Sequence, residues 1–403
     1  MTTVNDRSAV PNSNTDNSEL TDEEIFTAHE GGKLSVDVTA PLTTPRDLSI
    51  AYTPGVAKVS RAISTDETLT ERYTWTQQLV AVVSDGSAVL GLGDIGPRAS
   101  LPVMEGKSAL FKKFAGLNSI PLVLNTGDVE EVVETLVRLR PSFGAVNLED
   151  VAAPRCFEME RRLIEELDCP VMHDDQHGTA VVTLAALRNA CKVVGREMSS
   201  LRVVICGAGA AGVACAEILN TAGVAEIVVT DSRGVIHAGR DNLTPIKEEL
   251  AGYTNARGVT GDVGDALEGA DVLVGVSGGQ IPEEMIDRMS EGAIVFALSN
   301  PDPEIHPDTA RRHASVVATG RSDFPNQINN VLAFPGIFKG ALEAGARMIS
   351  DRMKVAAAEA IAAVATDELS AESIVPSALD PRVAPEVTEA VARAAREDGV
   401  ATA

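Results

Sequence analysis

The sequence is poor in basic residues and in cysteine, and it has no long hydrophobic run. It contains 34 Lys and Arg residues against 58 Asp and Glu, a formal charge of -24 at pH 7. Such a surface repels nucleic-acid phosphates and anionic headgroups, so we expect neither nucleic acid nor a membrane as a partner. No apolar run approaches the roughly 20 residues that span a bilayer. We therefore expect a cytoplasmic protein that binds any anionic substrate through local cations or a metal ion.

Cysteine usage and the first residues exclude further classes. The 5 cysteines are odd in number, form no CxxC pair and mostly lie among apolar residues, as buried small residues do. Neither a disulfide framework nor a zinc ribbon is expected. The polar N-terminus lacks both the apolar core of a secretory signal and the basic amphipathic pattern of a transit peptide.

Length and composition favour two folded domains. Hydrophobic residues make up 44% and charged residues 23% of the 403 residues, as in globular proteins with domains of roughly 150 to 200 residues. Residues 1–20 are rich in Asn, Ser, Thr and Asp, which predicts a disordered tail. We expect a first domain at 21–190, a second at 191–334, and helices at 335–403 that pack on the first domain and end in a mobile segment.

Apolar runs alternate with helical patterns between about residues 75 and 185. This alternation predicts a parallel α/β sheet, because parallel strands need crossovers of helical length. Ligand-binding groups gather at the carboxyl ends of the strands in such sheets. The segments NLED and HDD place acidic residues at two of these ends.

A glycine-rich loop follows the predicted strand LRVVIC and opens a helix, which is typical of a dinucleotide-binding domain. Asp231 ends the next strand nineteen positions beyond Gly212, where an acid can hold a ribose 2'-hydroxyl. The alternative is a plain glycine-rich turn. The predicted cofactor loop comprises Gly207, Gly209, Ala210, Ala211 and Gly212.

The choice between NAD and NADP stays open at this stage. Asp231 would repel a 2'-phosphate, yet Ser232 and Arg233 follow it, and an arginine can bind that phosphate. Later strand ends, at Gly278 with Gly279 and at Ser299 with Asn300, would face the nicotinamide. Each of these could equally be a turn.

Two pairs of adjacent acids follow predicted strands. Glu149 and Asp150 form one pair, and Asp174 and Asp175 form the other. Adjacent carboxylates repel each other unless a cation relieves them, so we expect a site for Mg²⁺ or Mn²⁺. The alternative is solvated loop carboxylates or a helix cap.

Three other residue types deserve a chemical interpretation beside a structural one. His173 and His177 could bind zinc, but hydrogen bonding to nearby carboxylates is the favoured role. Lys107 opens an apolar helix and could act as a base near a metal-bound substrate. Tyr52, one of 3 tyrosines, could deliver a proton. A surface lysine and a core tyrosine are the simpler alternatives for the last two.

Seven segments together resemble the malic enzyme family in its short bacterial form: AYTPGVA, VLGLGDIGP, PVMEGKSALF, NLEDVAAPRCFEME, HDDQHGTA, LSNP and NQINNVLAFPG. The resemblance covers about residues 22–365. It implies an N-terminal parallel α/β domain that binds malate and metal, a Rossmann-type NAD(P)-binding domain, and oxidative decarboxylation of L-malate to pyruvate and CO₂. The acetyltransferase-like domain of longer relatives is not expected.

The same resemblance implies roles for individual residues. Glu149, Asp150 and Asp175 would ligate Mn²⁺ or Mg²⁺, with Asp174 behind them. Lys107 would take the proton of the malate hydroxyl as hydride passes to NAD⁺ or NADP⁺. The remaining implied roles are protonation of enolpyruvate by Tyr52 and substrate binding by Asn300 and Asn330.

One departure from the family pattern concerns the malate carboxylate. An arginine that precedes LGLGD in larger relatives is Ala88 here, and Arg98 or Arg321 are the candidate replacements. The resemblance also implies a homodimer. Two alternatives stay open: a malolactic or tartrate-acting relative that uses the same site, and a non-catalytic nucleotide-sensing protein.

Overall fold

The computed structural model describes residues 20–366 and 369–401, so the predicted tail at 1–20 lies almost wholly outside the described residues. The chain divides into two units, Met1–Lys33 and Leu34–Ala403. The first contains helix α1 (Asp22–His29), none of whose residues is buried. Thr21 and Glu24 form a capping box at the start of this helix. The second unit contains both sheets.

The first sheet of this unit is parallel, with strand order β2-β1-β3-β4. Its strands are β1 (Leu79–Ser84), β2 (Asn118–Val123), β3 (Ala145–Leu148) and β4 (Val171–His173). The central strands β1 and β3 are buried along their whole length, as strands covered by helices on both faces must be. Because β3 and β4 are neighbours, the acids that follow them come to one edge of the sheet.

Helices and short turns precede, connect and follow the strands of this first sheet. They are η1 (Thr76–Gln78), α5 (Gly96–Leu110), the π-turn η2 (Phe111–Ala115), α6 (Val129–Leu139), η3 (Arg140–Ser142), α7 (Arg155–Glu166), α8 (Asp174–Val194) and η4 (Met198–Ser200). Apolar side chains of α6 and α7 form a core on one face of the sheet. The other face joins a larger core that includes α8.

The second sheet has the order β10-β9-β8-β5-β6-β7, and only β7 is antiparallel. Its strands are β5 (Arg202–Cys206), β6 (Glu226–Asp231), β7 (Gly234–Val235), β8 (Val272–Gly275), β9 (Ala293–Ala297) and β10 (Ala314–Thr319). The chain leaves β5 toward β6 and later returns to β8 on the other side of β5. This reversal is the topological switch point of a Rossmann-type sheet, where dinucleotides bind. The predicted fold class is confirmed.

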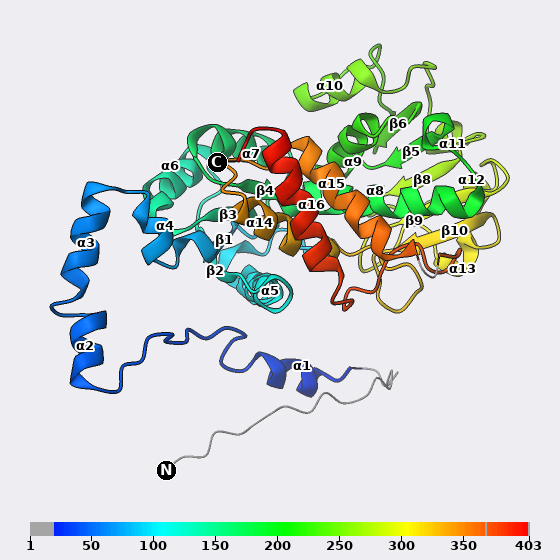
Figure 1. Cartoon of the computed structure of the whole chain (residues 1–403). Helices are drawn as coiled ribbons and strands as arrows, with labels where there is room; N and C mark the ends of the chain where they lie inside the picture. The colour runs from blue at the N-terminus through cyan, green and yellow to red at the C-terminus, as the bar shows by residue number, and fades with distance from the viewer. Residues whose placement is uncertain (1–19, 367–368, 402–403) are drawn as a thin grey trace. The chain divides into compact units, whose positions relative to one another are not determined.

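The remaining elements cover this second sheet and continue to the C-terminus (Figure 1). They are α9 (Ala210–Thr221), α10 (Pro245–Tyr253), α11 (Val263–Leu267), α12 (Glu283–Ile286), α13 (Pro307–Ala310), η5 (Asn330–Leu332), α14 (Phe334–Glu343), α15 (Asp351–Val364) and α16 (Val383–Glu397). Within the described residues, no helix is both long and apolar enough to cross a membrane.

Helix α8 is the structural link between the two sheets. It follows β4 directly and packs against α9 and α15, and fourteen of its 21 residues are buried. Its apolar side chains share one continuous core with both sheets and with the C-terminal helices. Figure 1 shows α15 and α16 side by side in orange and red, crossing this region.

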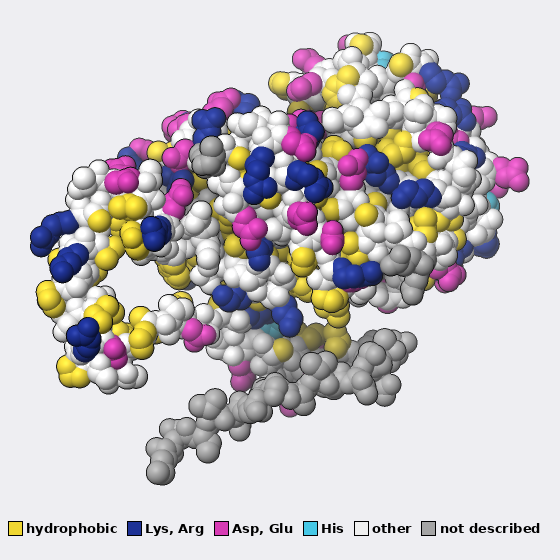
Figure 2. Space-filling view, in the orientation of Figure 1, with side chains coloured by type: hydrophobic (Ala, Val, Ile, Leu, Met, Phe, Trp, Pro, Cys, Tyr) yellow, Lys and Arg dark blue, Asp and Glu magenta, His cyan; other side chains and the backbone are white. Residues whose placement is uncertain are grey.

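Residues 34–75, which we call the arm, contribute nothing to the core. The arm contains α2 (Pro45–Ala51), α3 (Val56–Thr65) and α4 (Leu69–Tyr73), and none of these helices buries a residue. Its apolar side chains are exposed instead, and they are visible as yellow atoms along α2 and α3 in Figure 2. The alternative that Tyr52 is a core residue is therefore excluded, because Tyr52 lies between α2 and α3 and is 71% exposed.

Candidate active site

Three carboxylates meet at the carboxyl ends of β3 and β4. Glu149 and Asp150 follow β3, and Asp175 lies in the first turn of α8. One oxygen from each lies within 4.8 Å of the others, and this is the one cluster with metal-ligand character among the described residues. The set contains only oxygen donors, which suits Mg²⁺ or Mn²⁺ better than zinc.

The backbone at Asp150 fixes this arrangement. Its φ of 54° is left-handed, a conformation that Asp tolerates better than most residues. Its N–H donates to Oδ2 of Asp175 at 2.7 Å, and its carbonyl accepts from Ala88 N–H at 3.0 Å. Oδ2 of Asp150 is buried without a hydrogen-bond partner in the described chain. A buried carboxylate oxygen without a partner fits a cation ligand.

The pKa values of these three acids are shifted because the carboxylates are buried close to one another. Burial, and then the Asp175 charge, raise the pKa of Asp150 to about 7. Burial also raises the pKa of Glu149 well above its usual range, although Lys107 opposes it. The pKa of Asp175 is lowered, because His173 and the Asp150 N–H more than offset the effect of burial. Positive charge at this place would stabilise the ionised set.

Lys107 lies inside the acidic cluster. Its Nζ is 2.8 Å from Oε1 of Glu149 and 2.6 Å from Oδ2 of Asp174, and 4.2 Å from the centre of the Phe334 ring. Burial lowers the pKa of Lys107, but the two carboxylates outweigh it and the net shift is upward. The surface-lysine alternative is excluded, since the side chain is only 10% exposed.

Asp174 points away from the metal-ligand trio, toward Lys107 and Asn330. Asn330 Nδ2 donates to Oδ2 of Asp174 at 3.2 Å, and Thr179 Oγ1 donates to Oδ1 of Asn330 at 3.2 Å. Gly178 makes room for this arrangement, because a Cβ there would lie 1.9 Å from Oδ1 of Asp174. The structure thus brings Asn330 to the cluster from a segment over 150 residues away.

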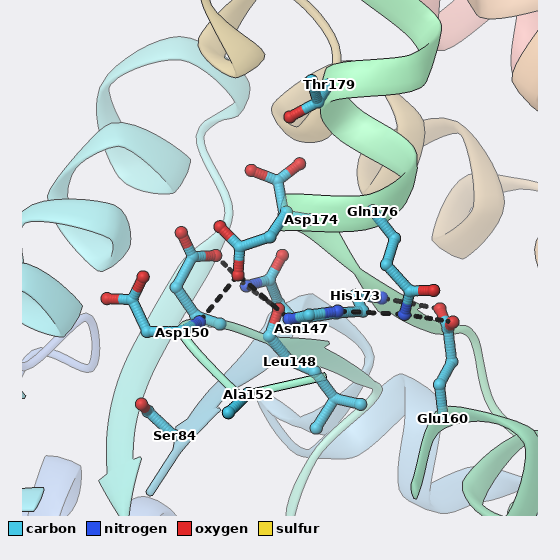
Figure 3. Close-up of polar contacts among 12 residues, drawn as sticks. Ser84, Asn147, Leu148, Asp150, Ala152, Glu160, His173, Asp174, Gln176 and Thr179 are labelled. Carbon is cyan, nitrogen blue, oxygen red and sulfur yellow. Dashed lines mark hydrogen bonds and ion pairs between the residues drawn. The ribbon is translucent and has the colours of Figure 1, made fainter. Parts of the chain in front are cut away.

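A buried hydrogen-bond network of Glu160, Gln176 and His173 lies next to Asp175 of the cluster (Figure 3). Gln176 Nε2 lies 3.0 Å from Oε2 of Glu160 and 2.9 Å from Nδ1 of His173. Because a carboxylate only accepts, the Gln176 group must be the NH₂, and Nδ1 of His173 must accept. His173 then carries its proton on Nε2, which faces Oδ2 of Asp175 at 2.9 Å.

His177 belongs to the same network. Among the described residues it is not part of a group that could hold a metal ion. Its Nε2 lies 3.0 Å from Oε2 of Glu160. Burial lowers the pKa of His177. Glu160 stays ionised: burial would raise its pKa, but His177 holds it at about 2. The zinc interpretation of His173 and His177 is therefore not supported, and the hydrogen-bonding role is. The sequence analysis missed Glu160 and Gln176.

The glycine-rich loop lies at the switch point of the second sheet. Gly207 has φ 120°, and a Cβ there would lie 2.6 Å from the Val276 carbonyl oxygen. A Cβ on Gly212 would lie 1.9 Å from the Gly207 oxygen, so this glycine is needed for helix packing. Gly209 differs, because a Cβ there would meet open space. That space, at the uncapped N-terminus of α9, fits a pyrophosphate.

The later strand ends are held together by a buried acid that the sequence analysis missed. Glu304 accepts from Ser277 N–H at 2.8 Å and from Ser299 Oγ at 2.5 Å. Ser299 Oγ in turn accepts from Gly278 N–H at 2.9 Å. Glu304 therefore fixes the loops after β8 and β9, next to Asn300.

One cavity joins the acidic cluster to the dinucleotide loop. It measures about 350 Å³. Its lining residues come from both sheets: Ala88, Leu90, Asp150, Val151, Ala153, Asp175, Thr179, Ala210, Ala211, Val276, Leu298 and Ser299. A substrate held by the acids would thus lie beside a dinucleotide bound at α9.

Several predicted residues lie elsewhere. Tyr52, in the exposed arm, is not part of the Lys107 cluster. Arg98 lines a separate cavity with Asn125. Arg321 is paired with Asp323 through two hydrogen bonds of 2.9 and 2.7 Å. Neither arginine lines the cavity that holds Asp150 and Asp175.

Comparison with known proteins agrees with this architecture. The malic enzyme N-terminal domain model matches residues 31–164, and the malic enzyme NAD-binding domain model matches residues 176–396. The first match contains strands β1, β2 and β3 of the first sheet, and the second contains all six strands of the second sheet.

Two bacterial malic enzymes match over nearly the whole length of both chains. The bifunctional malic/malolactic enzyme of Bacillus subtilis is 54% identical over 94% of each chain, and the NADP-dependent malic enzyme of Halomonas elongata is 48% identical over 92% of each. The crystal structure of the Pyrococcus horikoshii malic enzyme superposes with a TM-score of 0.91 at 45% identity, covering 94% of this chain and 91% of that one.

A Rossmann-type sheet that shares a cavity with an acidic cluster is typical of an enzyme that uses a dinucleotide cofactor. The chain belongs to the malic enzyme family. The known reaction of this family is the oxidative decarboxylation of malate with NAD or NADP, and a divalent metal ion is a general requirement.

Proposed function

We propose that this chain oxidises and decarboxylates L-malate to pyruvate and CO₂ at the cavity between the two sheets. The observation that carries the proposal is the position of Lys107, held between Glu149 and Asp174 beside a three-carboxylate cluster that shares its cavity with the N-terminus of α9. We also propose a cytoplasmic location, where the nicotinamide cofactor is available.

We propose that Glu149, Asp150 and Asp175 hold Mn²⁺ or Mg²⁺. The mutual proximity of their oxygens and the partnerless buried Oδ2 of Asp150 support this assignment. When bound, the ion would polarise the malate hydroxyl and the resulting ketone as a Lewis acid, and its charge would lower the pKa of Lys107.

Lys107 is proposed as the base that takes the hydroxyl proton of malate. Its Nζ is held by two carboxylates and by the Phe334 ring, and one of those carboxylates belongs to the proposed metal ligand Glu149. Asp174 accepts a hydrogen bond from Nζ and is a short path for the proton that Lys107 gains. Asn330, bonded to Asp174, and Asn300, after β9, are proposed to bind the substrate carboxylates.

The nicotinamide dinucleotide is proposed to bind across the switch point, with its pyrophosphate at the loop from Gly207 to Gly212. When bound, the cofactor would supply the acceptor for the hydride of malate C2. The open space at Gly209 and the Glu304-braced loops after β8 and β9 support this placement.

We propose that the domains divide as 21–190, catalytic, and 191–334, dinucleotide-binding, with 335–403 returning to the first domain. Phe334 and Phe338 of α14 support the last assignment, because their rings lie 4.7 and 5.4 Å from that of Phe111, which follows α5.

A homodimer is proposed because the helices of the arm bury no residue within one chain. Its apolar side chains Val36, Val38, Leu48 and Ile50 are more than half exposed, an arrangement that is typical of a surface covered by another chain (Figure 2). We propose that a second copy covers the arm and that Tyr52 protonates the enol product in the partner's site.

A complementation experiment tests the placement of Tyr52. Tyr52→Phe and Lys107→Ala proteins, each inactive alone, are unfolded together, refolded and assayed. If Tyr52 acts across the dimer, mixed dimers hold one intact site, and about a quarter of wild-type activity returns. No recovery in confirmed mixed dimers would place Tyr52 in its own chain's site.

The reaction itself is tested by initial rates with L-malate and each dinucleotide, with Mn²⁺ and with a chelator. Equal amounts of reduced cofactor, pyruvate and CO₂ are expected, and the chelator should abolish all three. The malolactic alternative is favoured by the bifunctional Bacillus subtilis relative. Lactate formed without net cofactor reduction would identify it, whereas nucleotide binding without either product would indicate a sensing protein.

A further inference from the structure

Asp231, at the end of β6, is not free to accept hydrogen bonds from the ribose hydroxyls, although the sequence pattern predicts that role. The Asp231 side chain is only 8% exposed. Its Oδ1 accepts from Arg240 Nη1 and from Arg233 N–H, both at 2.9 Å, and its Oδ2 accepts from Arg240 Nη2 at 2.5 Å and Lys247 Nζ at 2.6 Å. Four donors therefore use the lone pairs with which a carboxylate would hold hydroxyl groups.

The two cations come from separate elements and are held in place. Arg240 follows β7 and also donates to the carbonyl oxygens of Gly234 and Val235 at 3.0 and 3.3 Å. Lys247 lies in the first turn of α10, whose N-terminus adds partial positive charge on the same side. Both remain partly accessible, with side chains 13% and 24% exposed.

The charge at this place is positive. Two cations against one carboxylate leave a net positive charge, and the side chain of Arg233 is exposed beside them. Burial would raise the pKa of Asp231, but Arg240 and Lys247 hold it below its usual range, so the carboxylate stays ionised. On a chain of net charge -24, such a local cationic group is the feature that can attract an additional phosphate.

We propose that Arg240 and Lys247, with Arg233, recognise the 2'-phosphate of NADP⁺, and that Asp231 positions these cations instead of binding the ribose hydroxyls. The chain then prefers NADP⁺ to NAD⁺. This inference rests on the proposed dinucleotide site at the adjacent glycine-rich loop. It reverses the preference that an acid at the end of this strand ordinarily indicates.

Calorimetry with cofactor fragments tests the preference without turnover. Adenosine 2',5'-bisphosphate and adenosine 5'-monophosphate share the adenosine and differ in the 2'-phosphate. The bisphosphate should bind roughly ten- to hundredfold tighter, and the difference should shrink in high salt. Equal or tighter binding of the monophosphate overturns the inferred NADP⁺ preference but leaves the proposed dinucleotide site standing. If neither fragment, nor NADH or NADPH, binds, the proposed dinucleotide site itself fails.

Substitutions separate recognition from folding. Arg240→Ala and Lys247→Ala should each weaken the bisphosphate roughly tenfold or more and leave the monophosphate within about twofold. Lys247→Ala keeps the test decisive if Arg240→Ala does not fold, because Lys247 makes fewer contacts. Arg138→Ala, on the far helix α6, is the charge-matched control and should change neither affinity.

Asp231→Asn discriminates between the two roles of the acid. If Asp231 only positions the cations, loss of its ion pairs to Arg240 and Lys247 weakens bisphosphate binding and spares the monophosphate and NADH. A loss of monophosphate and NADH affinity, with the bisphosphate unaffected, would show that Asp231 holds the ribose and would overturn the inference. In steady-state assays, kcat/KM for NADP⁺ relative to NAD⁺ should fall in Lys247→Ala.

Discussion

Nε2 of His173 lies 2.9 Å from Oδ2 of Asp175, the same oxygen that accepts the Asp150 N–H. His173 is itself fixed by Gln176, and Gln176 by Glu160. A chain of buried polar groups thus orients one proposed metal ligand. Groups that orient ligands contribute substantially to metal affinity.

We predict that His173→Asn weakens Mn²⁺ binding roughly ten- to hundredfold, because Asp175 loses its orienting contact. Dinucleotide binding should not change. Electron paramagnetic resonance of free Mn²⁺ measures the metal affinity, and fluorescence of bound NADPH measures the dinucleotide affinity. His313→Asn, in the turn between α13 and β10, is the control. Equal Mn²⁺ affinity in a folded His173→Asn protein would contradict the orienting role.

Metal affinity should depend on pH. The pKa of Asp150 is raised to about 7 by burial and by Asp175, so below pH 7 this carboxylate binds a proton that the metal must displace. Mn²⁺ affinity should therefore rise roughly tenfold per pH unit up to about pH 7 and level off above it. Titrations from pH 5.5 to 8.5 provide the measurement, and a flat profile would rule out this linkage.

Loss of Lys107 should abolish catalysis and spare nucleotide binding. We expect kcat to fall roughly 10²- to 10⁴-fold in Lys107→Ala, the usual contribution of a positioned base. Lys107→Arg keeps the charge between Glu149 and Asp174 and should retain the thermal stability without the activity. Lys113→Ala, an exposed neighbour, serves as control. Substantial turnover by the arginine variant would show that charge alone is required.

Two glycines of one loop should respond differently to substitution. Gly212→Ala places a Cβ 1.9 Å from the Gly207 oxygen, so the melting temperature should fall by about 3 to 10 °C. Gly209→Ala meets open space, so the protein should melt as wild type but bind NADPH at least roughly tenfold more weakly. Unaltered NADPH binding by Gly209→Ala would place the pyrophosphate elsewhere.

Proximity at the strand ends could be predicted from sequence. Glu149 and Asp175 follow strands that helical crossovers make parallel, and parallel neighbours end at one edge. The loop at Gly207 was predictable for a similar reason, since its spacing fixes it between a strand and a helix. In both cases local pattern and topology determine the position.

Side-chain partners could not be predicted. Arg240 and Lys247 lie nine and sixteen residues beyond Asp231, in segments without periodicity, so no pattern links them to that carboxylate. Glu304 is buried although Glu is rarely buried unless paired, and its partners are backbone and serine groups. The exposure of Tyr52 depends on how the whole arm packs, which its local sequence does not specify.

Helix α8 carries Asp174 and Asp175 at its first turn, while its buried length is packed against the interior of both halves. The two domains therefore cannot unfold independently, because they share one hydrophobic core. Heating should produce one calorimetric peak, whose van't Hoff and measured enthalpies agree, and the capacity to retain Mn²⁺ should vanish in that same peak.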